Sequence, residues 1–117
     1  MGKASLLLVD DDETSSQILG YILVDEGYEV DHAATGGAAI EKMSTRRYDL
    51  VILDFVLPDM SGHYVAERMK TITPDIKIIL LTGYAKKGDP LEERYERMLL
   101  KPVPPNILVE TIVEILG

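Results

Sequence analysis

The stretch LVILDFVLPDMSG, residues 50–62, decides the fold, because an apolar run ends at an aspartate and a sharp turn follows. Residues 50–53 are consecutive branched aliphatic side chains, which is typical of a strand buried on both faces within a parallel sheet. A carboxylate beside such a strand is costly unless a cation or hydrogen-bond donors partner it. Asp54 is therefore a candidate functional residue at the end of a central strand.

Apolar runs of the same kind recur along the chain, at residues 6–9, 78–81 and, in a shorter form, 98–100. Residues 28–33 alternate instead, with Tyr28, Val30 and His32 on one side. This alternation predicts a half-exposed edge strand. The sequence thus indicates five strands, of which the inner ones are fully buried.

Segments with helical spacing lie between the strands. Four of them have an apolar stripe and a signal for where the helix begins or ends. Residues 14–26 carry Ile18, Leu19, Ile22 and Leu23 and stop at Gly27, and the segment capped by Thr35 carries Ile40 and Met43. The segment from Ser61 to Pro74 carries Val65, Met69 and Ile72, and the segment that begins at Pro104 and Pro105 carries Leu108, Ile112 and Ile115. Residues 86–97 carry only Leu91 and Tyr95 at this spacing, so a helix there is predicted to be short or irregular. The alternation predicts an α/β domain with right-handed crossovers covering both faces of a parallel sheet.

The composition limits the class of protein. The 117 residues suit one domain, residues 1–117, and no apolar run approaches the roughly 20 residues of a membrane span. Twelve basic and twenty acidic side chains give a net charge of -8, which argues against direct binding of nucleic acid. The absence of cysteine excludes disulfides and thiolate metal sites, and no export signal is visible. We expect a cytoplasmic protein.

Polar side chains follow each of the apolar runs. Asp10, Asp11 and Asp12 follow the first run, and Asp54, Thr82 and Lys101 each follow one of the later ones. The carboxyl ends of strands in an open parallel sheet share one edge, where ligands bind. Clustered carboxylates repel one another unless a cation intervenes, and hard oxygen ligands suit Mg²⁺. A magnesium site is therefore predicted at this edge.

These residue types also suit phosphoryl chemistry. An aspartate whose charge is partly neutralised can attack a phosphoryl group and form an aspartyl phosphate. The Lys101 ammonium can balance the phosphoryl oxygens, and the Thr82 hydroxyl can donate a hydrogen bond. Taken singly, each residue has an ordinary interpretation: acids before a helix cap it, and Asp59 in PDMSG is a turn residue.

At these residues the chain resembles the receiver domain of two-component response regulators. The matching pieces are LLLVDDDE, VILDFVLPDMSG, IILLTGYA and LLKP, in order and across essentially the whole chain. The resemblance implies a CheY-like, flavodoxin-like (βα)5 three-layer fold with strand order 2-1-3-4-5. It implies phosphotransfer from a sensor histidine kinase or a phosphotransfer protein, a signalling role rather than turnover catalysis, and a possible phosphorylation-dependent dimer. No output domain is expected in this chain.

The resemblance also assigns roles to individual residues. It implies that Asp54 is the phosphoacceptor, that Asp10 and Asp11 serve Mg²⁺ together with Asp54 and the Val56 carbonyl, that Thr82 is the switch hydroxyl, and that Lys101 is the phosphate partner. Pro58 and Gly62 match the turn after the acceptor strand, and the Lys101–Pro102 bond is expected to be cis.

The chain departs from the family pattern in three places. Met98 stands three positions before the lysine, where an aromatic switch residue is common, although Tyr84 or Tyr95 could substitute. The interval between Thr82 and Lys101, 101 minus 82 or nineteen positions, is short for the family. Val56 and Tyr84 occupy positions that tune access of water to the phosphoryl group, and their character predicts a long-lived phosphorylated state.

Two other functions fit parts of the pattern. Met98 and the short interval are compatible with an interaction module that no longer depends on phosphorylation. A metal-dependent phosphohydrolase would need an acidic residue two positions after its nucleophile, where this chain has Val56. His32 and His63 have no second ligand at metal-binding spacing, and His63 is predicted to be a surface residue in the first turn of a helix.

Overall fold

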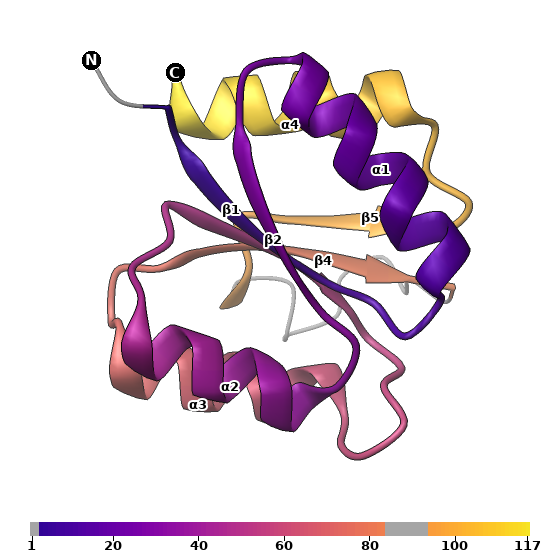
Figure 1. Ribbon diagram of the computed structural model, residues 1–117. Coiled ribbons are helices and arrows are strands. Elements are labelled where there is room, and N and C mark those ends of the chain that lie inside the picture. Colours follow the sequence, from indigo (N-terminus) through magenta and orange to yellow (C-terminus); the bar gives the residue numbers. More distant parts are fainter. Residues whose placement is uncertain (1–2, 84–93) are drawn as a thin grey trace.

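The computed structural model describes residues 3–83 and 94–117, which form a five-stranded parallel sheet with helices on both faces (Figure 1). The elements in chain order are β1 (Ser5–Val9), α1 (Glu13–Asp25), β2 (Glu29–Ala33), α2 (Gly36–Thr45), β3 (Leu50–Asp54), α3 (Gly62–Ile72), β4 (Lys77–Thr82), β5 (Arg97–Leu100) and α4 (Pro105–Leu116). The strand order is β2-β1-β3-β4-β5, as the resemblance implied. The predicted short helix falls mostly on residues 84–93, outside the described residues.

Each face of the sheet carries its own core. On one face, Met43 of α2 and Met69 of α3 pack against Leu7, Val51 and their neighbours on the strands. On the other face, Leu23 of α1 and Ile112 of α4 pack against residues such as Leu8. Figure 1 shows the same arrangement, with α1 and α4 on one side and α2 and α3 on the other. The continuous apolar runs are thus explained by burial on both faces.

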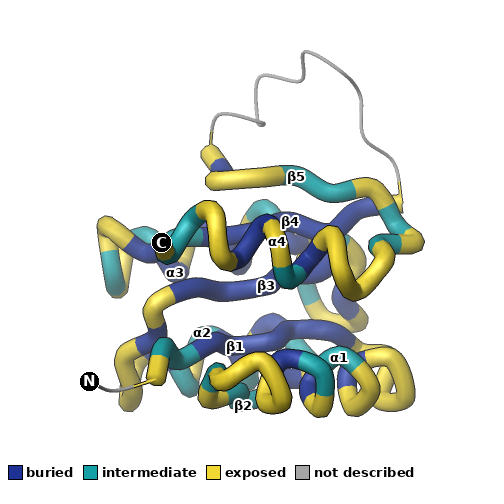
Figure 2. Tube along the Cα trace, turned by 90° about the horizontal axis from the view of Figure 1, so that it is seen from above, coloured by how far each residue is buried: buried dark blue, intermediate teal, exposed yellow. Residues whose placement is uncertain are grey.

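The two edge strands are less buried than the three inner ones (Figure 2). In β2, Tyr28 and Val30 pack toward one core, while Asp31 accepts hydrogen bonds from Arg46 and Tyr48. The prediction of a half-exposed edge strand at residues 28–33 is therefore confirmed. Because β1, β3 and β4 are central, the residues at their carboxyl ends meet in the middle of the sheet edge.

Side chains cap three helices where the sequence offers suitable residues. Asp12 accepts from the backbone N–H of Ser15 at the start of α1, Thr35 from Ala38 in α2, and Ser61 from Tyr64 in α3, with donor–acceptor distances of 3.0 to 3.3 Å. Pro105 is the first residue of α4. Within the described residues, no helix has the length and apolar content needed to cross a membrane.

The inner faces predicted for two helices were partly wrong. Ile18 in α1 is 53% exposed and Ile72 at the end of α3 is 36% exposed. Helix α1 buries Leu23, as predicted, and also Ser16 and Gly20, which the apolar stripe did not include. A Cβ atom on Gly20 would lie 2.6 Å from the Cε1 atom of His32, so the small residue allows the helix to approach β2 closely.

Tyr48 allows a stability prediction for the β2 edge. Its buried hydroxyl donates to Asp31 at 2.6 Å, and burial, with the Asp31 hydrogen bond, raises the pKa of Tyr48 to about 12. Because the protonated form is favoured by folding, its contribution is fully present below pH 10.0 and is lost as the pH rises toward 12. Tyr48→Phe should lower the free energy of unfolding by about 1–2 kcal/mol at neutral pH.

Urea unfolding of the Tyr48→Phe variant measures this effect. Tyr21→Phe is the matched control, because Tyr21 is 75% exposed on α1 and its hydroxyl should contribute little. A tyrosinate absorbance titration should also lose its most alkaline component in the Tyr48 variant alone. Equal stabilities for the two variants would contradict the role given to the Asp31 hydrogen bond.

Candidate metal and phosphoryl site

Four strand ends bring the predicted site residues to one edge of the sheet. Asp10 follows β1, Asp54 is the last residue of β3, Thr82 is the last residue of β4, and Lys101 follows β5. One carboxylate oxygen from each of Asp10, Asp11 and Asp54 lies within 4.8 Å of the other two. The Lys101 Nζ atom lies 2.8 Å from Oδ2 of Asp54. The structure thus brings together the side chains of Asp10, Asp11, Asp54 and Lys101, as the sequence predicts.

The position of Asp10 is fixed by backbone contacts. Its N–H donates to the Ala33 carbonyl at 3.1 Å, and its Oδ1 atom accepts from the N–H of Asp12 at 2.9 Å. Burial raises the pKa of the Asp10 carboxyl, and the charges of Asp54 and Asp11 act in the same direction. The Asp12 N–H and the Lys101 ammonium oppose this shift without cancelling it. The charged form of Asp10 is therefore held in an unfavourable environment.

Asp54 lies between a cation and a turn. Its side chain is 8% exposed, Oδ2 contacts Lys101, and Oδ1 accepts a hydrogen bond of 3.4 Å from the N–H of Val56. The following residue, Phe55, donates its N–H to the Leu81 carbonyl at 2.9 Å and accepts from Gly62 at 2.8 Å. These bonds hold the acceptor strand to β4 on one side and to the start of α3 on the other.

Gly62 is required for this turn. A Cβ atom at Gly62 would lie 2.8 Å from Cα of Phe55 and 2.9 Å from the carbonyl oxygen of Asp54. Both are backbone atoms that cannot move aside without displacing the loop. The glycine expected from the sequence therefore has a steric reason in the structure.

Lys101 is anchored by its own backbone. Its N–H donates to the Thr82 carbonyl at 2.7 Å, and the Lys101–Pro102 bond is cis, as expected. Burial alone would lower the pKa of Lys101, but the hydrogen bond and charge of Asp54, with the charges of Asp10 and Asp11, raise it. The ammonium group therefore remains a cation beside Asp54.

Thr82 and Val56 lie on either side of this centre. Thr82 is buried at 1% exposure at the end of β4, whereas Val56 is 71% exposed in the loop after Asp54. The backbone of Val56 pairs with Ser61 in an isolated bridge. The switch role of Thr82 and the metal contact of the Val56 carbonyl stay predictions.

The three carboxylates suit a magnesium ion. Carboxylate oxygens are the hard ligands that Mg²⁺ binds in proteins. One oxygen from each of Asp10, Asp11 and Asp54 lies within 4.8 Å of the other two, so these three side chains would hold the ion. Asp11 is exposed, which leaves an open side of the cluster for water or a phosphoryl oxygen.

The sequence interpretation missed the function of Asp59. Its carboxylate accepts hydrogen bonds from the N–H groups of Gly36 at 2.8 Å and Gly37 at 2.9 Å, and these bonds lower its pKa. Asp59 thus ties the loop after Asp54 to the first turn of α2. A Cβ atom at Gly36 would lie 2.4 Å from Cγ of Met60, so glycine allows the loop to approach. The adjacent glycines Gly36 and Gly37 are the feature of the sequence that could have indicated this close approach.

The sequence interpretation also missed the contacts of His63. Its ring lies 4.7 Å from that of Phe55, measured between centroids, and its Nδ1 atom forms a hydrogen bond with the hydroxyl of Tyr95. His63 is in the first turn of α3, as predicted, but is half-buried. His32 forms a hydrogen bond of 2.8 Å with Ser16. Tyr84, the other aromatic candidate, lies outside the described residues.

A groove of about 490 Å³ adjoins the site between α1 and the loop that leads into α4. Its polar end is formed by Asp10, Asp12 and Lys101. Its apolar part includes Ile18 and Val103. The exposed position of Ile18 therefore places an apolar side chain beside the charged cluster.

Comparisons with known proteins agree with this geometry. A family model for the response regulator receiver domain matches residues 6–113. The response regulator receiver protein CpdR of Brucella abortus is 33% identical over 114 residues, 95% of this chain and 95% of that protein.

Two solved structures are similar over nearly the whole chain. A CheY-like receiver domain protein from Methanospirillum hungatei aligns with a TM-score of 0.91 and 36% identity, covering 98% of this chain and 94% of that one. The response regulator TrrA of Thermotoga maritima, crystallised in complex with Mg(2+)-BeF, aligns with a TM-score of 0.86 and 35% identity, covering 95% of this chain and 97% of that one.

Proposed function

Because the chain belongs to the receiver domain family of two-component response regulators, we propose that it accepts a phosphoryl group on Asp54 and changes a partner surface in response. The observation that carries this proposal is the 2.8 Å contact between Lys101 and Asp54 beside two further carboxylates. A nucleophile, a cation for the phosphoryl oxygens and a set of magnesium ligands are thereby held in one place.

The chemistry follows from these positions. A carboxylate oxygen of Asp54 attacks the phosphorus of a phosphohistidine, the P–N bond breaks, and the released imidazole nitrogen takes up a proton. The product is a mixed anhydride on Asp54. Bound Mg²⁺ would neutralise charge on the phosphoryl oxygens, with Asp10, Asp11 and Asp54 as its protein ligands.

Lys101 and Thr82 have separate roles in this proposal. The Lys101 ammonium exchanges its contact with Asp54 for one with a phosphoryl oxygen, so its charge is compensated before and after transfer. The Thr82 hydroxyl, at the end of β4, donates to another phosphoryl oxygen and draws the following loop toward the site. The chain thus catalyses its own phosphorylation without acting as a turnover enzyme.

The partner in this proposal is a sensor histidine kinase or a phosphotransfer protein in the cytoplasm. A phosphohistidine ring must approach Asp54 from solvent, and the groove between α1 and the loop into α4 opens beside the charged cluster. Its apolar residues would contact the partner, and its carboxylates favour a basic surface.

The test is intact-protein mass after incubation with acetyl phosphate, with and without Mg²⁺. A single phosphoryl adduct that requires Mg²⁺ is the expected result. If neither acetyl phosphate nor a phosphorylated kinase gives an adduct, the proposal is wrong and a phosphorylation-independent interaction module becomes the better interpretation. Release of free phosphate in many turnovers would instead favour the phosphohydrolase, which Val56 disfavours.

Val56 permits a prediction for the lifetime of the phosphorylated state. Its exposed isopropyl group, two residues after Asp54, cannot hydrogen-bond an attacking water. In Val56→Asn the amide can orient that water, and one added hydrogen bond of about 1 kcal/mol corresponds to roughly fivefold faster hydrolysis. Val56→Ile, which adds a methylene group but no hydrogen-bonding group, is the matched control and should decay at the wild-type rate. Decay of the adduct is followed by mass, and equal lifetimes for Val56→Asn and wild type would contradict the shielding argument.

A further inference from the structure

A continuous set of ring contacts leads from Asp54 to the residues that precede β5. Phe55 follows Asp54 directly, and its ring packs on His63 with a centroid distance of 4.7 Å. His63 in turn is hydrogen-bonded to the hydroxyl of Tyr95, and their ring centroids are 5.7 Å apart. Tyr95 is buried at 7% exposure and lies two residues before β5. Three side chains therefore connect the acceptor loop to the last strand.

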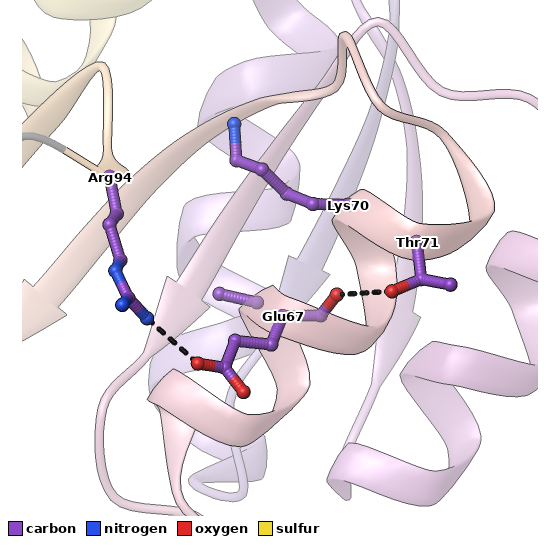
Figure 3. A pocket seen from close by; sticks show the side chains of 5 residues that line it. Glu67, Lys70, Thr71 and Arg94 are labelled. Atoms are coloured by element: carbon purple, nitrogen blue, oxygen red, sulfur yellow. Dashed lines mark hydrogen bonds and ion pairs between the residues drawn. The ribbon is translucent and has the colours of Figure 1, made fainter.

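The neighbouring turn of α3 makes a second contact with the same segment. Glu67 lies four residues after His63, on the same side of the helix, and accepts from Arg94 at 2.7 Å. Figure 3 shows this ion pair, with Thr71 bonded to the Glu67 carbonyl in the next turn. Both partners are more than half exposed, so the pair itself adds little stability. The ion pair is informative for its position, because it is the place where the segment that contains Tyr95 contacts α3 at the surface.

The pair of Glu67 and Arg94 borders a groove of about 580 Å³ whose other lining residues are Ala66, Lys70 and Thr71. The shape and charge of this groove depend on the position of Arg94 relative to α3. Arg94 directly precedes Tyr95 in the chain, so a displacement of the backbone at Tyr95 would be passed to Arg94. The groove is therefore a surface that the buried contacts can alter.

The backbone of Phe55 makes the coupling physically direct. Phe55 is hydrogen-bonded to Leu81 on β4 and to Gly62 at the start of α3, and it is covalently joined to the phosphoacceptor. Met98, by contrast, is flexible and half-buried, and it presents neither a ring nor a hydrogen-bonding group. The part-buried hydrogen bond between His63 and the Tyr95 hydroxyl, in contrast, is favourable only over a narrow range of distances and angles.

We propose that His63 and Tyr95 couple the state of Asp54 to the surface formed by Glu67 and Arg94. The hydrogen bond between His63 and Tyr95 has one arrangement with unmodified Asp54 and another when a phosphoryl group occupies the site. This inference rests on the proposed phosphorylation of Asp54 and adds the route by which it reaches a partner surface. His63 and Tyr95 are positioning residues, since neither touches the phosphoryl group.

The first measurement is the NMR spectrum of the histidine rings in the full chain. The sequence has two histidines, His32 and His63, so two variants, His32→Gln and His63→Gln, assign both signals. Beryllofluoride, a mimic of the phosphoryl group, is added to protein already saturated with Mg²⁺. The His63 signal should shift on this addition. An unchanged His63 signal in protein that has bound beryllofluoride would overturn the inference.

The second measurement tests energetic coupling. Tyr95→Phe and His63→Gln should each change the affinity for beryllofluoride by about fivefold or more, because coupling between sites is reciprocal. Their affinity for Mg²⁺ alone should stay within about twofold of wild type, because the carboxylates are untouched. The double variant should differ little from either single variant, since both remove the same hydrogen bond. Tyr21→Phe is the matched control, because Tyr21 is 75% exposed on α1.

The outcomes separate this inference from the proposed function. If wild-type protein fails to bind beryllofluoride with Mg²⁺, the proposed function itself fails. If wild type binds and both variants have wild-type affinity, His63 and Tyr95 have no part in the coupling. A lower thermal stability of the variants without a change in affinity would show a purely structural contact and would also overturn the inference.

Discussion

An Asp54→Asn variant should carry no phosphoryl group after incubation with acetyl phosphate and Mg²⁺ under conditions that label the wild type. The side-chain amide has nearly the same shape as the carboxylate, but its nitrogen is a poor nucleophile and its oxygen bears no full negative charge. Asp54 is also the carboxylate nearest to Lys101, at 2.8 Å, so a phosphoryl group on another residue would lack this cation. We expect loss of the adduct rather than a reduced rate.

The control for this experiment is Asp75→Asn. Asp75 is exposed and precedes β4, at the opposite edge of the sheet, so it undergoes the same chemical change far from the site. Its adduct should equal that of wild type. An adduct retained in Asp54→Asn would move the acceptor to Asp10 or Asp11, the other two carboxylates of the cluster. Circular dichroism of both variants checks that the fold is intact.

The fold was predictable because its strands are buried on both faces. Residues such as Leu50 and Val51 point to opposite cores, and each neighbour along the run is apolar for that reason. Helix ends were predictable where a capping residue such as Ser61 or Thr35 has a local partner. The burial of Ser16 and Gly20 in α1 was not predictable, because both residues contact His32 on another element.

The membership of the candidate site was predictable for a topological reason. Parallel strands place their carboxyl ends at one edge, so Asp10, Asp54 and Lys101 had to come close once the strands were assigned. The sequence could not specify which oxygen of Asp54 contacts Lys101, or the environment that raises the pKa of Asp10. These depend on side-chain rotamers and burial.

The contacts of the loops were not predictable from local patterns. The Asp59 carboxylate bonds to residues on another helix, and the His63–Tyr95 bond joins positions separated by 32 residues. Neither partner of such a pair repeats at a helical or strand interval, so periodicity contains no information about it. The sequence features that came closest to indicating these loop contacts were Gly36 and Gly62, since each permits a close approach of the loop.

The second large effect concerns Asp10. Asp10→Asn should weaken Mg²⁺ binding and, in the absence of Mg²⁺, stabilise the protein. The weaker binding follows from loss of a charged ligand and should be at least the roughly 10–100-fold that removal of an outer partner of a metal site causes. The gain in stability follows because Asp10 is 6% exposed and one of its oxygens lies within 4.8 Å of oxygens of Asp11 and Asp54. Burial of the charged carboxylate is the largest cause of the raised pKa of Asp10, and the like charges of Asp54 and Asp11 add to it, while the Asp12 N–H and Lys101 oppose it without cancelling it.

The direction of the stability change follows from proton linkage. The pKa of Asp10 is raised in the folded protein, so its contribution to stability is complete below its ordinary value of 3.8 and is lost as the pH rises through the folded-state pKa. Asparagine does not ionise and therefore avoids this loss at neutral pH. A gain on the order of 1–2 kcal/mol is expected for partly compensated charges at this spacing. Asp75→Asn should show no comparable gain.

Urea unfolding with and without Mg²⁺ measures both effects in one experiment. Wild type should gain stability with Mg²⁺ because the ion binds the folded state and removes the repulsion, whereas Asp10→Asn should begin more stable and gain less. The two unfolding curves should therefore converge or cross as Mg²⁺ is added. A variant that is less stable than wild type without Mg²⁺, or that gains as much from the ion, would show that Asp10 does not belong to the metal cluster. The convergence would mean that this protein retains mutually repelling carboxylates, at a cost to its own stability, in order to bind the cation that the proposed phosphoryl transfer to Asp54 would use.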